Sequence, residues 1–474
     1  METTVYDVIV LGGGAVGENV ADRAVQGGLT AVIVESELVG GECSYWACMP
    51  SKVLLRPGQV LRAARQVPGA AEAVTGELNL VAILERRNSF ASNWSDAGQV
   101  RWMKQAGIAL ARGHGRITGP KEVSVTGADG SATLLTARHA VVVATGSDAF
   151  VPDIDGLHEA RPWTSREATS AQSVPGSLVI LGGGVVATEM ATAYAGFGTE
   201  VTVVSRSGLL KHVEPFAAEL VTEALREQGA TVLLDTQTRR VTRIEDKVVV
   251  ELGDGSTITA EEILVATGRT PRTDDIGLDT IGLEPGSWLE TDDTLLVRGS
   301  DWLYAAGDVT NRALLTHQGK YQARAAGDVI AARAKGAPVA DKPWGAHVAT
   351  ADHAAVPQVT FTEPEVASVG LTAAAAGEAG YDIRVVDYEL GNVAGASVRA
   401  DGYKGTARMV VDEQRKVILG VTFVGPDVSE LLQAATVAVV AEVPLDRLWH
   451  AVPAYPTVNE IWLRLLETYG RPTA

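Results

Sequence analysis

Near its start the chain reads Val8-Ile9-Val10-Leu11-Gly12-Gly13-Gly14-Ala15-Val16-Gly17. This apolar run ends in glycines and leads through a helix-like stretch to a second apolar run over residues 31–34, which predicts a βαβ unit. The pattern recurs as Leu178-Val179-Ile180-Leu181-Gly182-Gly183-Gly184-Val185-Val186-Ala187, followed by an apolar run over residues 201–204. Two copies in this strand–turn–helix context favour two dinucleotide sites over ordinary glycine-rich turns.

Both glycine motifs have the residue types that a dinucleotide needs. Glycine permits the tight turn and lets a pyrophosphate approach the helix N-terminus, where backbone N–H groups lack partners. The expected contacts are Gly12, Gly14 and Gly17 in the first motif and Gly182, Gly184 and Ala187 in the second.

The residue that ends the second strand differs between the two units. Glu35 lies 23 positions after Gly12, and Ser205 lies 23 positions after Gly182. A carboxylate such as Glu35 accepts hydrogen bonds from a ribose diol. Ser205 and Arg206 suit a 2′-phosphate, so the second site is predicted to prefer NADPH to NADH. The alternative for Arg206 is an ordinary surface charge.

Three further segments place residues at the carboxyl ends of strands, where α/β sheets bind ligands. Two apolar strands end in Ala-Thr-Gly, at Gly146 and Gly268. The third segment, over residues 303–308, delivers Gly307 and Asp308, and His317 follows it downstream. The second βαβ unit is therefore predicted to lie between parts of the first domain.

The only two cysteines, Cys43 and Cys48, lie in Gly40-Gly41-Glu42-Cys43-Ser44-Tyr45-Trp46-Ala47-Cys48-Met49-Pro50-Ser51-Lys52. In a regular helix, Cα atoms five residues apart are about 8–9 Å apart, whereas a disulfide needs less than about 7 Å. A bridge therefore requires a distorted turn, which would make it easily reduced. A zinc site is disfavoured because the two thiols have no further His or Cys ligand nearby in the sequence. Two unrelated buried cysteines remain an alternative, but a redox pair is favoured.

Composition limits the class of protein. The 474 residues correspond to about three domains, and the 46% of hydrophobic residues exclude disorder as the main state. The net charge of -18 argues against nucleic acid as a partner. No signal peptide is recognisable, and no apolar stretch approaches the ~20 residues of a membrane helix. We therefore expect a soluble, cytoplasmic protein with no membrane partner, and no metal site.

The sequence resembles the class I pyridine nucleotide–disulfide oxidoreductases over essentially its whole length. The resemblance rests on the Gly-Gly-x-Cys-x4-Cys-x-Pro-Ser-Lys box, both nucleotide motifs, both Ala-Thr-Gly segments and the Gly-Asp element. It implies an α/β fold of two Rossmann-like dinucleotide-binding domains, one inserted in the other, plus a C-terminal α+β dimerisation domain of a homodimer. The implied boundaries are 1–150 and 271–345 for the FAD-binding domain, 151–270 for the NAD(P)H-binding domain and 346–474 for the dimerisation domain.

The resemblance also implies roles for individual residues. Electrons would pass from NADPH through FAD to a Cys43–Cys48 disulfide, with Cys48 facing the flavin and Cys43 meeting the substrate. Lys52 and Glu189 match the family's ion pair near flavin N5. His317 matches a histidine near the flavin, although it could equally make only a structural hydrogen bond. The other implied contacts are Gly146, Gly307 and Asp308 for FAD and Gly268 for the nicotinamide cofactor.

The chain departs from the family pattern at its acid–base element. Members carry His-Pro-Thr-x-x-Glu, supplied by the other subunit, whereas this chain reads Tyr455-Pro456-Thr457-Val458-Asn459-Glu460. Tyrosine, with a pKa near ~10, is a poorer base than histidine near ~6.5, which calls fast thiol–disulfide turnover into question. Tyr455 either takes part in the chemistry together with Glu460 or only shapes the pocket.

The cysteine box also departs from the family pattern. Glu42 is expected to raise the pKa of Cys43 by like-charge repulsion, if the two are close. Tyr45 and Trp46 would either form a platform for a planar substrate or simply pack, and packing is favoured.

We therefore expect an NADPH-dependent FAD enzyme that reduces a small disulfide or another acceptor through Cys43 and Cys48. One alternative is a quinone or metal-ion reductase in which the disulfide is secondary. A lipoamide dehydrogenase-like enzyme and a non-enzymatic FAD-binding redox sensor are the others. Mercuric reductases share the tyrosine but use a further C-terminal cysteine pair, and no cysteine follows Cys48, so efficient mercury reduction is not expected.

Overall fold

The computed structural model describes residues 3–471, and the chain divides into two compact units. The first unit comprises Met1–Pro50, Asn88–Ala149 and Arg269–His353. The second comprises Ser51–Arg87, Phe150–Gly268 and Ala354–Ala474. Each unit is therefore assembled from three separate stretches of the chain.

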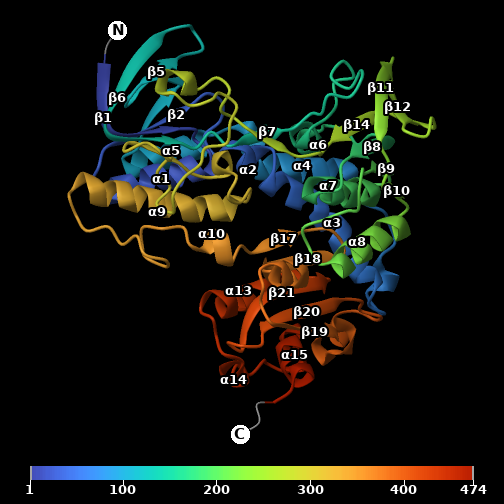
Figure 1. Cartoon of the computed structure of the whole chain (residues 1–474). Coiled ribbons are helices and arrows are strands. Elements are labelled where there is room, and N and C mark those ends of the chain that lie inside the picture. The colour runs from blue at the N-terminus through green and yellow to red at the C-terminus, as the bar shows by residue number, and fades with distance from the viewer. Residues whose placement is uncertain (1–2, 472–474) are drawn as a thin grey trace. The chain divides into compact units, whose positions relative to one another are not determined.

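A seven-stranded sheet forms the centre of the first unit, in the order β3-β2-β1-β6-β5-β4, with β16 paired to β6 (Figure 1). Its strands are β1 (Thr3–Leu11), β2 (Ala31–Glu35), β3 (Ala109–Arg112), β4 (His114–Gly119), β5 (Glu122–Thr126), β6 (Ala132–Val143) and β16 (Leu303–Ala305). The pairs β1·β2, β1·β6, β2·β3 and β16·β6 are parallel. The run Val8–Val10 is wholly buried, as expected for a strand covered on both faces.

Two helices, α1 (Ala15–Gln26) and α9 (Thr316–Ala334), lie side by side and share a core with the sheet (Figure 1). Small residues allow the close approach, because a Cβ on Gly327 would overlap the backbone of α1 and the Cβ of Arg23. The other elements of this unit are α2 (Gly41–Tyr45), η2 (Ser92–Trp94), α5 (Ala97–Ala106), β7 (Ser147–Ala149), β15 (Arg269–Pro271), η3 (Leu278–Ile281), η4 (Asp308–Thr310) and α10 (Ala351–Ala354).

The second glycine motif lies in a parallel sheet of the second unit, in the order β10-β9-β8-β14. Its strands are β8 (Ser177–Leu181), β9 (Glu200–Val204), β10 (Thr231–Leu233) and β14 (Glu262–Val265). A separate antiparallel sheet contains β11 (Thr238–Ile244), β12 (Lys247–Leu252) and β13 (Thr257–Ala260). The accompanying helices are α3 (Cys48–Arg65), η1 (Ala71–Ala73), α4 (Leu80–Phe90), α6 (Ser165–Ser170), α7 (Val185–Gly196) and α8 (Pro215–Glu227).

The C-terminal part of the chain forms an antiparallel sheet in the order β17-β18-β21-β20-β19. Its strands are β17 (Gln358–Thr360), β18 (Glu365–Gly370), β19 (Ile383–Glu389), β20 (Thr406–Asp412) and β21 (Val417–Gly425). Its helices are α11 (Ala373–Glu378), η5 (Leu390–Asn392), α12 (Ala394–Arg399), η6 (Val428–Leu431), α13 (Leu432–Val440), α14 (Leu445–Leu448), η7 (Val458–Glu460) and α15 (Ile461–Tyr469). The α/β class, with two βαβ nucleotide units and a C-terminal α+β part, is confirmed.

Across residues 3–471, none of the helices combines the length and the apolar character that a membrane crossing requires.

Candidate active site

The first glycine motif forms a tight turn between β1 and α1. Gly12 has a φ of 101°, and a Cβ there would overlap the carbonyl of Ala144. A Cβ on Gly17 would overlap the carbonyl oxygen of Gly12. Gly14 is the N-cap of α1 and makes no side-chain capping bond, so the first-turn N–H groups are available to an anionic ligand.

Glu35 at the end of β2 is held against this turn. Its Oε2 accepts a hydrogen bond of 2.7 Å from the Gly13 N–H, and its Oε1 accepts one of 2.7 Å from the Glu37 N–H. These bonds orient the carboxylate beside the glycine motif, where the sequence predicts a ribose.

The second motif repeats the geometry of the first. Gly182 has a φ of 129°, and a Cβ there would overlap the carbonyl of Ala266. Gly184 caps α7 without a side-chain bond, and its Cβ position is open. Ser205 is buried at the end of β9 and its Oγ accepts a 3.4 Å bond from the Ser207 N–H, whereas Arg206 is exposed. The guanidinium is therefore accessible to a ligand bound at this strand end.

Asp308, which follows β16, is positioned by the ribbon of β7 and β15. The Ser147 hydroxyl donates a 2.6 Å bond to Asp308 Oδ2 and accepts a 2.9 Å bond from Arg269 Nε. Gly307 has a φ of 80°, and its N–H donates a 2.7 Å bond to Gln322 Oε1. Ser147 thus holds the Asp308 carboxylate, and Gln322 holds the backbone turn at Gly307.

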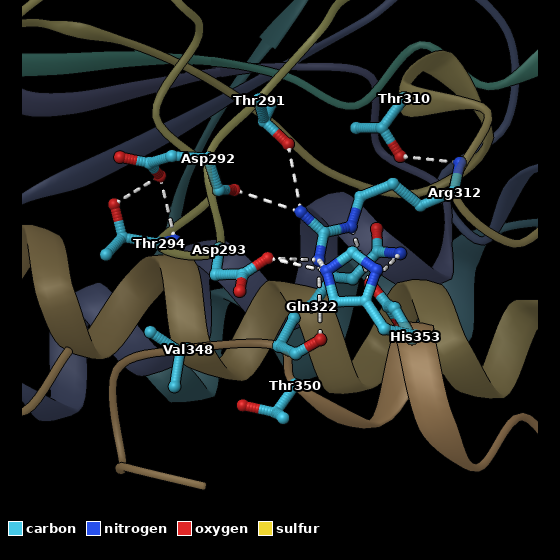
Figure 2. Close-up of polar contacts among 12 residues, drawn as sticks. Thr291, Asp292, Asp293, Thr294, Thr310, Arg312, Gln322, Val348, Thr350 and His353 are labelled. Atoms are coloured by element: carbon cyan, nitrogen blue, oxygen red, sulfur yellow. Dashed lines mark hydrogen bonds and ion pairs between the residues drawn. The ribbon is translucent and has the colours of Figure 1, made fainter. Parts of the chain in front are cut away.

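A polar network, buried at Gln322 and Asp352 and exposed at His353, supports Gln322, and sequence reasoning missed it (Figure 2). Gln322 Nε2 and Arg312 Nε each donate a 2.9 Å bond to Asp352 Oδ2. Arg312 Nη2 also bonds Asp293 Oδ1 at 2.8 Å, and His353 Nε2 lies 2.7 Å from the same oxygen. Burial raises the pKa of Asp352, although Arg312 opposes the rise. The network connects the Gly307 turn to the end of α10.

Cys43 and Cys48 are brought together by a break between two helices. Cys43 lies in α2, Trp46 at its end has a φ of -137°, and α3 begins at Cys48. This is the distorted turn that a bridge between them needs, and both cysteines are free thiols here. Cys48 Sγ also lies 3.2 Å from the hydroxyl of Thr316 at the start of α9. Sequence reasoning did not find Thr316, because no local pattern connects it to the cysteines.

The environment of Cys43 differs from the one expected. The hydrogen bond with Cys48 and burial raise the pKa of the Cys43 thiol, while Thr316 and Lys320 lower it. The Glu42 carboxylate, which the sequence predicts to raise this pKa, instead pairs with Arg272 at 2.8 Å.

Tyr45 packs in the interior, the favoured of its two interpretations, since it is 1% exposed and its hydroxyl donates a 2.9 Å bond to the Val39 carbonyl.

Residues 3–471 contain no cluster of three or more His, Cys, Asp or Glu side chains suited to a metal ion.

In the second unit, Lys52 and Glu189 form an ion pair of 2.8 Å. The Glu189 side chain is 4% exposed, and its other oxygen accepts a 3.0 Å bond from the Phe361 N–H. Lys52 Nζ also lies 4.9 Å from the centre of the Phe361 ring. A residue of the C-terminal part therefore orients both members of the pair, which the sequence did not indicate.

The other residues that the sequence predicts for the site, Tyr455, Glu460 and His317, differ in how far their side chains are exposed to solvent. Tyr455 is 77% exposed. Glu460 is buried and accepts a 3.3 Å bond from the Gly395 N–H. His317 follows Thr316 in the first turn of α9 and is exposed.

Glu18, in the first turn of α1, provides a test of the electrostatics at the glycine motif. Its Oε1 is buried and without a hydrogen-bond partner among the described residues. Burial raises the pKa of Glu18 from 4.5 to about 7, with Lys320 opposing and Glu35 adding to the rise. The folded state therefore binds the proton of the Glu18 carboxyl group more tightly than the unfolded state does. The stability of the fold that depends on this protonation is lost as the pH rises through about 7.

We expect Glu18→Gln to stabilise the protein at pH 8 by about 1–3 kcal/mol and to have little effect at pH 5. Thermal unfolding at both pH values measures this difference. An equal gain in stability at pH 5 and at pH 8 would show that Glu18 does not titrate between these two pH values.

The chain was compared with known proteins. Residues 6–336 match the family described as pyridine nucleotide-disulphide oxidoreductase, and residues 356–465 match the dimerisation domain of that family. A mercuric reductase of Staphylococcus aureus is 30% identical over 461 residues, covering 96% of this chain and 81% of that protein. A dihydrolipoyl dehydrogenase of Chlorobaculum tepidum is 32% identical over 469 residues, covering 96% and 95%.

Among solved structures, the HOCl-induced flavoprotein disulfide reductase RclA from Escherichia coli matches with a TM-score of 0.83 at 23% identity. The match covers 98% of this chain and 99% of that one, and it bears on the fold alone. The matched domains and the two relatives show that the chain belongs to the class I pyridine nucleotide-disulphide oxidoreductase family, a family that binds FAD and NAD(P)H.

Proposed function

We propose that this protein uses NADPH to reduce a small disulfide through FAD and the Cys43–Cys48 pair. The observation that carries the proposal is the helix break that brings two free thiols together, with the Thr316 hydroxyl held 3.2 Å from Cys48. A thiol pair at a helix break can close to a disulfide and reopen with little backbone change.

The residues around the first glycine motif fit FAD. The uncapped α1 N-terminus would bind its pyrophosphate, through Gly12, Gly14 and Gly17, and Glu35 would bind its ribose. The proposed contacts nearer the flavin are Lys52, Gly146, Gly307, Asp308 and His317. When bound, FAD supplies the two-electron carrier between nicotinamide and sulfur.

The protein's own groups have separate tasks in this scheme. The Thr316 hydroxyl donates to Cys48 when that sulfur is a thiolate, which stabilises the charge. Cys43 is the thiol that attacks the substrate disulfide. Glu189 holds the Lys52 ammonium in place.

The proposed domains are residues 1–150 and 271–345 for FAD, 151–270 for NADPH and 346–474 for dimerisation. The matched dimerisation domain supports a homodimer. In that dimer, Tyr455 and Glu460 would contribute to the substrate pocket of the other subunit, and the 77% exposure of Tyr455 suits this role.

The NADPH preference rests on Ser205 and Arg206, with Gly182, Gly184, Ala187 and Gly268 forming the rest of the proposed site. We expect Arg206→Gln to raise KM for NADPH about 10- to 100-fold, because a charge-assisted bond to the 2′-phosphate is lost. KM for NADH should change little, and steady-state kinetics with both cofactors measures the difference. The exposed Arg239→Gln is the matched control. Equal losses with both cofactors would contradict the assignment.

A quinone or metal-ion acceptor is the second candidate function, and Tyr455 favours it. A tyrosine is a weak base near neutral pH, so an acceptor that needs no proton delivery to a leaving thiol suits this chain better. Anaerobic NADPH titration of the holoprotein, followed by a panel of disulfides, quinones and metal ions, tests both functions. Quinone turnover that survives Cys43→Ser would support the second, and its complete loss would support the first.

A further inference from the structure

Arg272 bridges two carboxylates, and one of them, Glu42, directly precedes Cys43 in the chain. Its Nη2 lies 2.8 Å from Glu42 Oε1 and 2.6 Å from Asp148 Oδ1, and its Nε donates a 2.7 Å bond to the same Asp148 oxygen. The side chains of Arg272 and Glu42 are 28% and 20% exposed, whereas Asp148 is half-exposed. Partial burial limits solvent screening, so this bridge is stronger than an ordinary surface pair.

The bridge connects the cysteine helix to a fixed part of the first unit. Glu42 precedes Cys43 in α2, which is only five residues long. Asp148 lies in β7, and Arg272 directly follows β15, its antiparallel partner. The Arg272 backbone is itself anchored, because its N–H donates to Gly146 and its carbonyl accepts a 2.7 Å bond from the Thr145 hydroxyl. A short helix is therefore tied by one side chain to a rigid ribbon.

The bridge also determines the charge next to Cys43. Cys48, Thr316 and Lys320 act on the pKa of this thiol, and Glu42 precedes it in the chain. An unpaired carboxylate near a thiol disfavours the thiolate, which is the nucleophilic form. Arg272 compensates the charge of Glu42.

We propose that Arg272 is a positioning residue for Cys43, which it serves by neutralising Glu42 and by anchoring α2 to the β7–β15 ribbon. The proposal rests on the proposed role of Cys43 as the thiol that meets the substrate. It makes the Glu42–Arg272 pair a determinant of how fast Cys43 reacts near neutral pH.

The test is the rate at which iodoacetamide alkylates Cys43, measured from pH 6 to 10 in the holoprotein after reduction with a phosphine. Peptide mass spectrometry identifies the modified thiol. We expect Arg272→Gln to lower the rate at pH 7 about three- to tenfold and to move the profile to higher pH, because Glu42 is left uncompensated. Glu42→Gln should not slow the reaction, since Arg272 keeps Asp148 as its partner.

The double variant Glu42→Gln/Arg272→Gln separates charge from packing. It should recover most of the rate lost in Arg272→Gln, because the carboxylate that precedes the thiol is gone and only the half-exposed Asp148 still loses its contact with Arg272. Arg138→Gln breaks a 3.0 Å pair with Asp7 in the same unit and serves as the control. An unchanged profile in Arg272→Gln, or a double variant as slow as the single one, would overturn the inference. A Cys48 thiolate next to the flavin should give the reduced wild type a long-wavelength absorption band. If that band is absent, the result counts against the proposed function rather than against the role of Arg272.

Discussion

Cys48→Ser will abolish the long-wavelength absorption band of the NADPH-reduced holoprotein and will reduce disulfide turnover to background. The band requires a thiolate next to the flavin, and the serine hydroxyl does not ionise near neutral pH. Thr316, 3.2 Å from Cys48 Sγ, would then have no thiolate to stabilise. Anaerobic titration with NADPH, followed by visible spectroscopy and a disulfide assay, measures both effects.

Cys43→Ser is the matched control for this result. It should lose disulfide turnover to the same extent but keep the band, because Cys48 and its contact with Thr316 remain. A band that persists in Cys48→Ser, or that disappears only in Cys43→Ser, would reverse the assignment of the two sulfurs.

Gly17→Ala is expected to give protein that retains little or no FAD. A Cβ at this position would overlap the carbonyl oxygen of Gly12, and neither side of the contact is a flexible side chain. The Gly12 backbone is itself held in place, because its N–H donates a 2.9 Å bond to the Val34 carbonyl. Overpacking of this kind costs about 1–3 kcal/mol or more, and the turn that would bind the pyrophosphate would be displaced.

The ratio of FAD to protein after purification, read from the visible spectrum, measures this loss. Gly76→Ala is the control, because its Cβ position is open. Far-UV circular dichroism distinguishes loss of the cofactor from loss of the fold. Stoichiometric FAD in Gly17→Ala would contradict the role of this turn.

Much of the architecture was predictable because its determinants are local. A strand, a glycine turn and a helix within about 30 residues form a βαβ unit whatever surrounds them. The glycine positions and Glu35 could therefore be identified by register. Likewise, the spacing of Cys43 and Cys48 predicts that a bridge between them needs a distorted turn, and the break at Trp46 supplies one.

The supporting contacts were not predictable, because they join distant positions. Thr316 contacts a cysteine 268 positions earlier in the chain, and Arg272 contacts Glu42 across 230. The Phe361 N–H reaches Glu189 across 172 positions. No periodicity or spacing rule extends over such separations, so a residue of ordinary type receives its role only from packing.

The sequence by itself determined the two nucleotide folds, the sulfur pair and the absence of the usual histidine, because each depends on residue identity within a short stretch. The tertiary structure alone decided that Glu42 meets a guanidinium rather than a thiol, and that a phenylalanine of the C-terminal part orients Lys52 and Glu189. The physical reason is that the effect of a charge depends on its neighbours in space, which the close packing of remote segments selects.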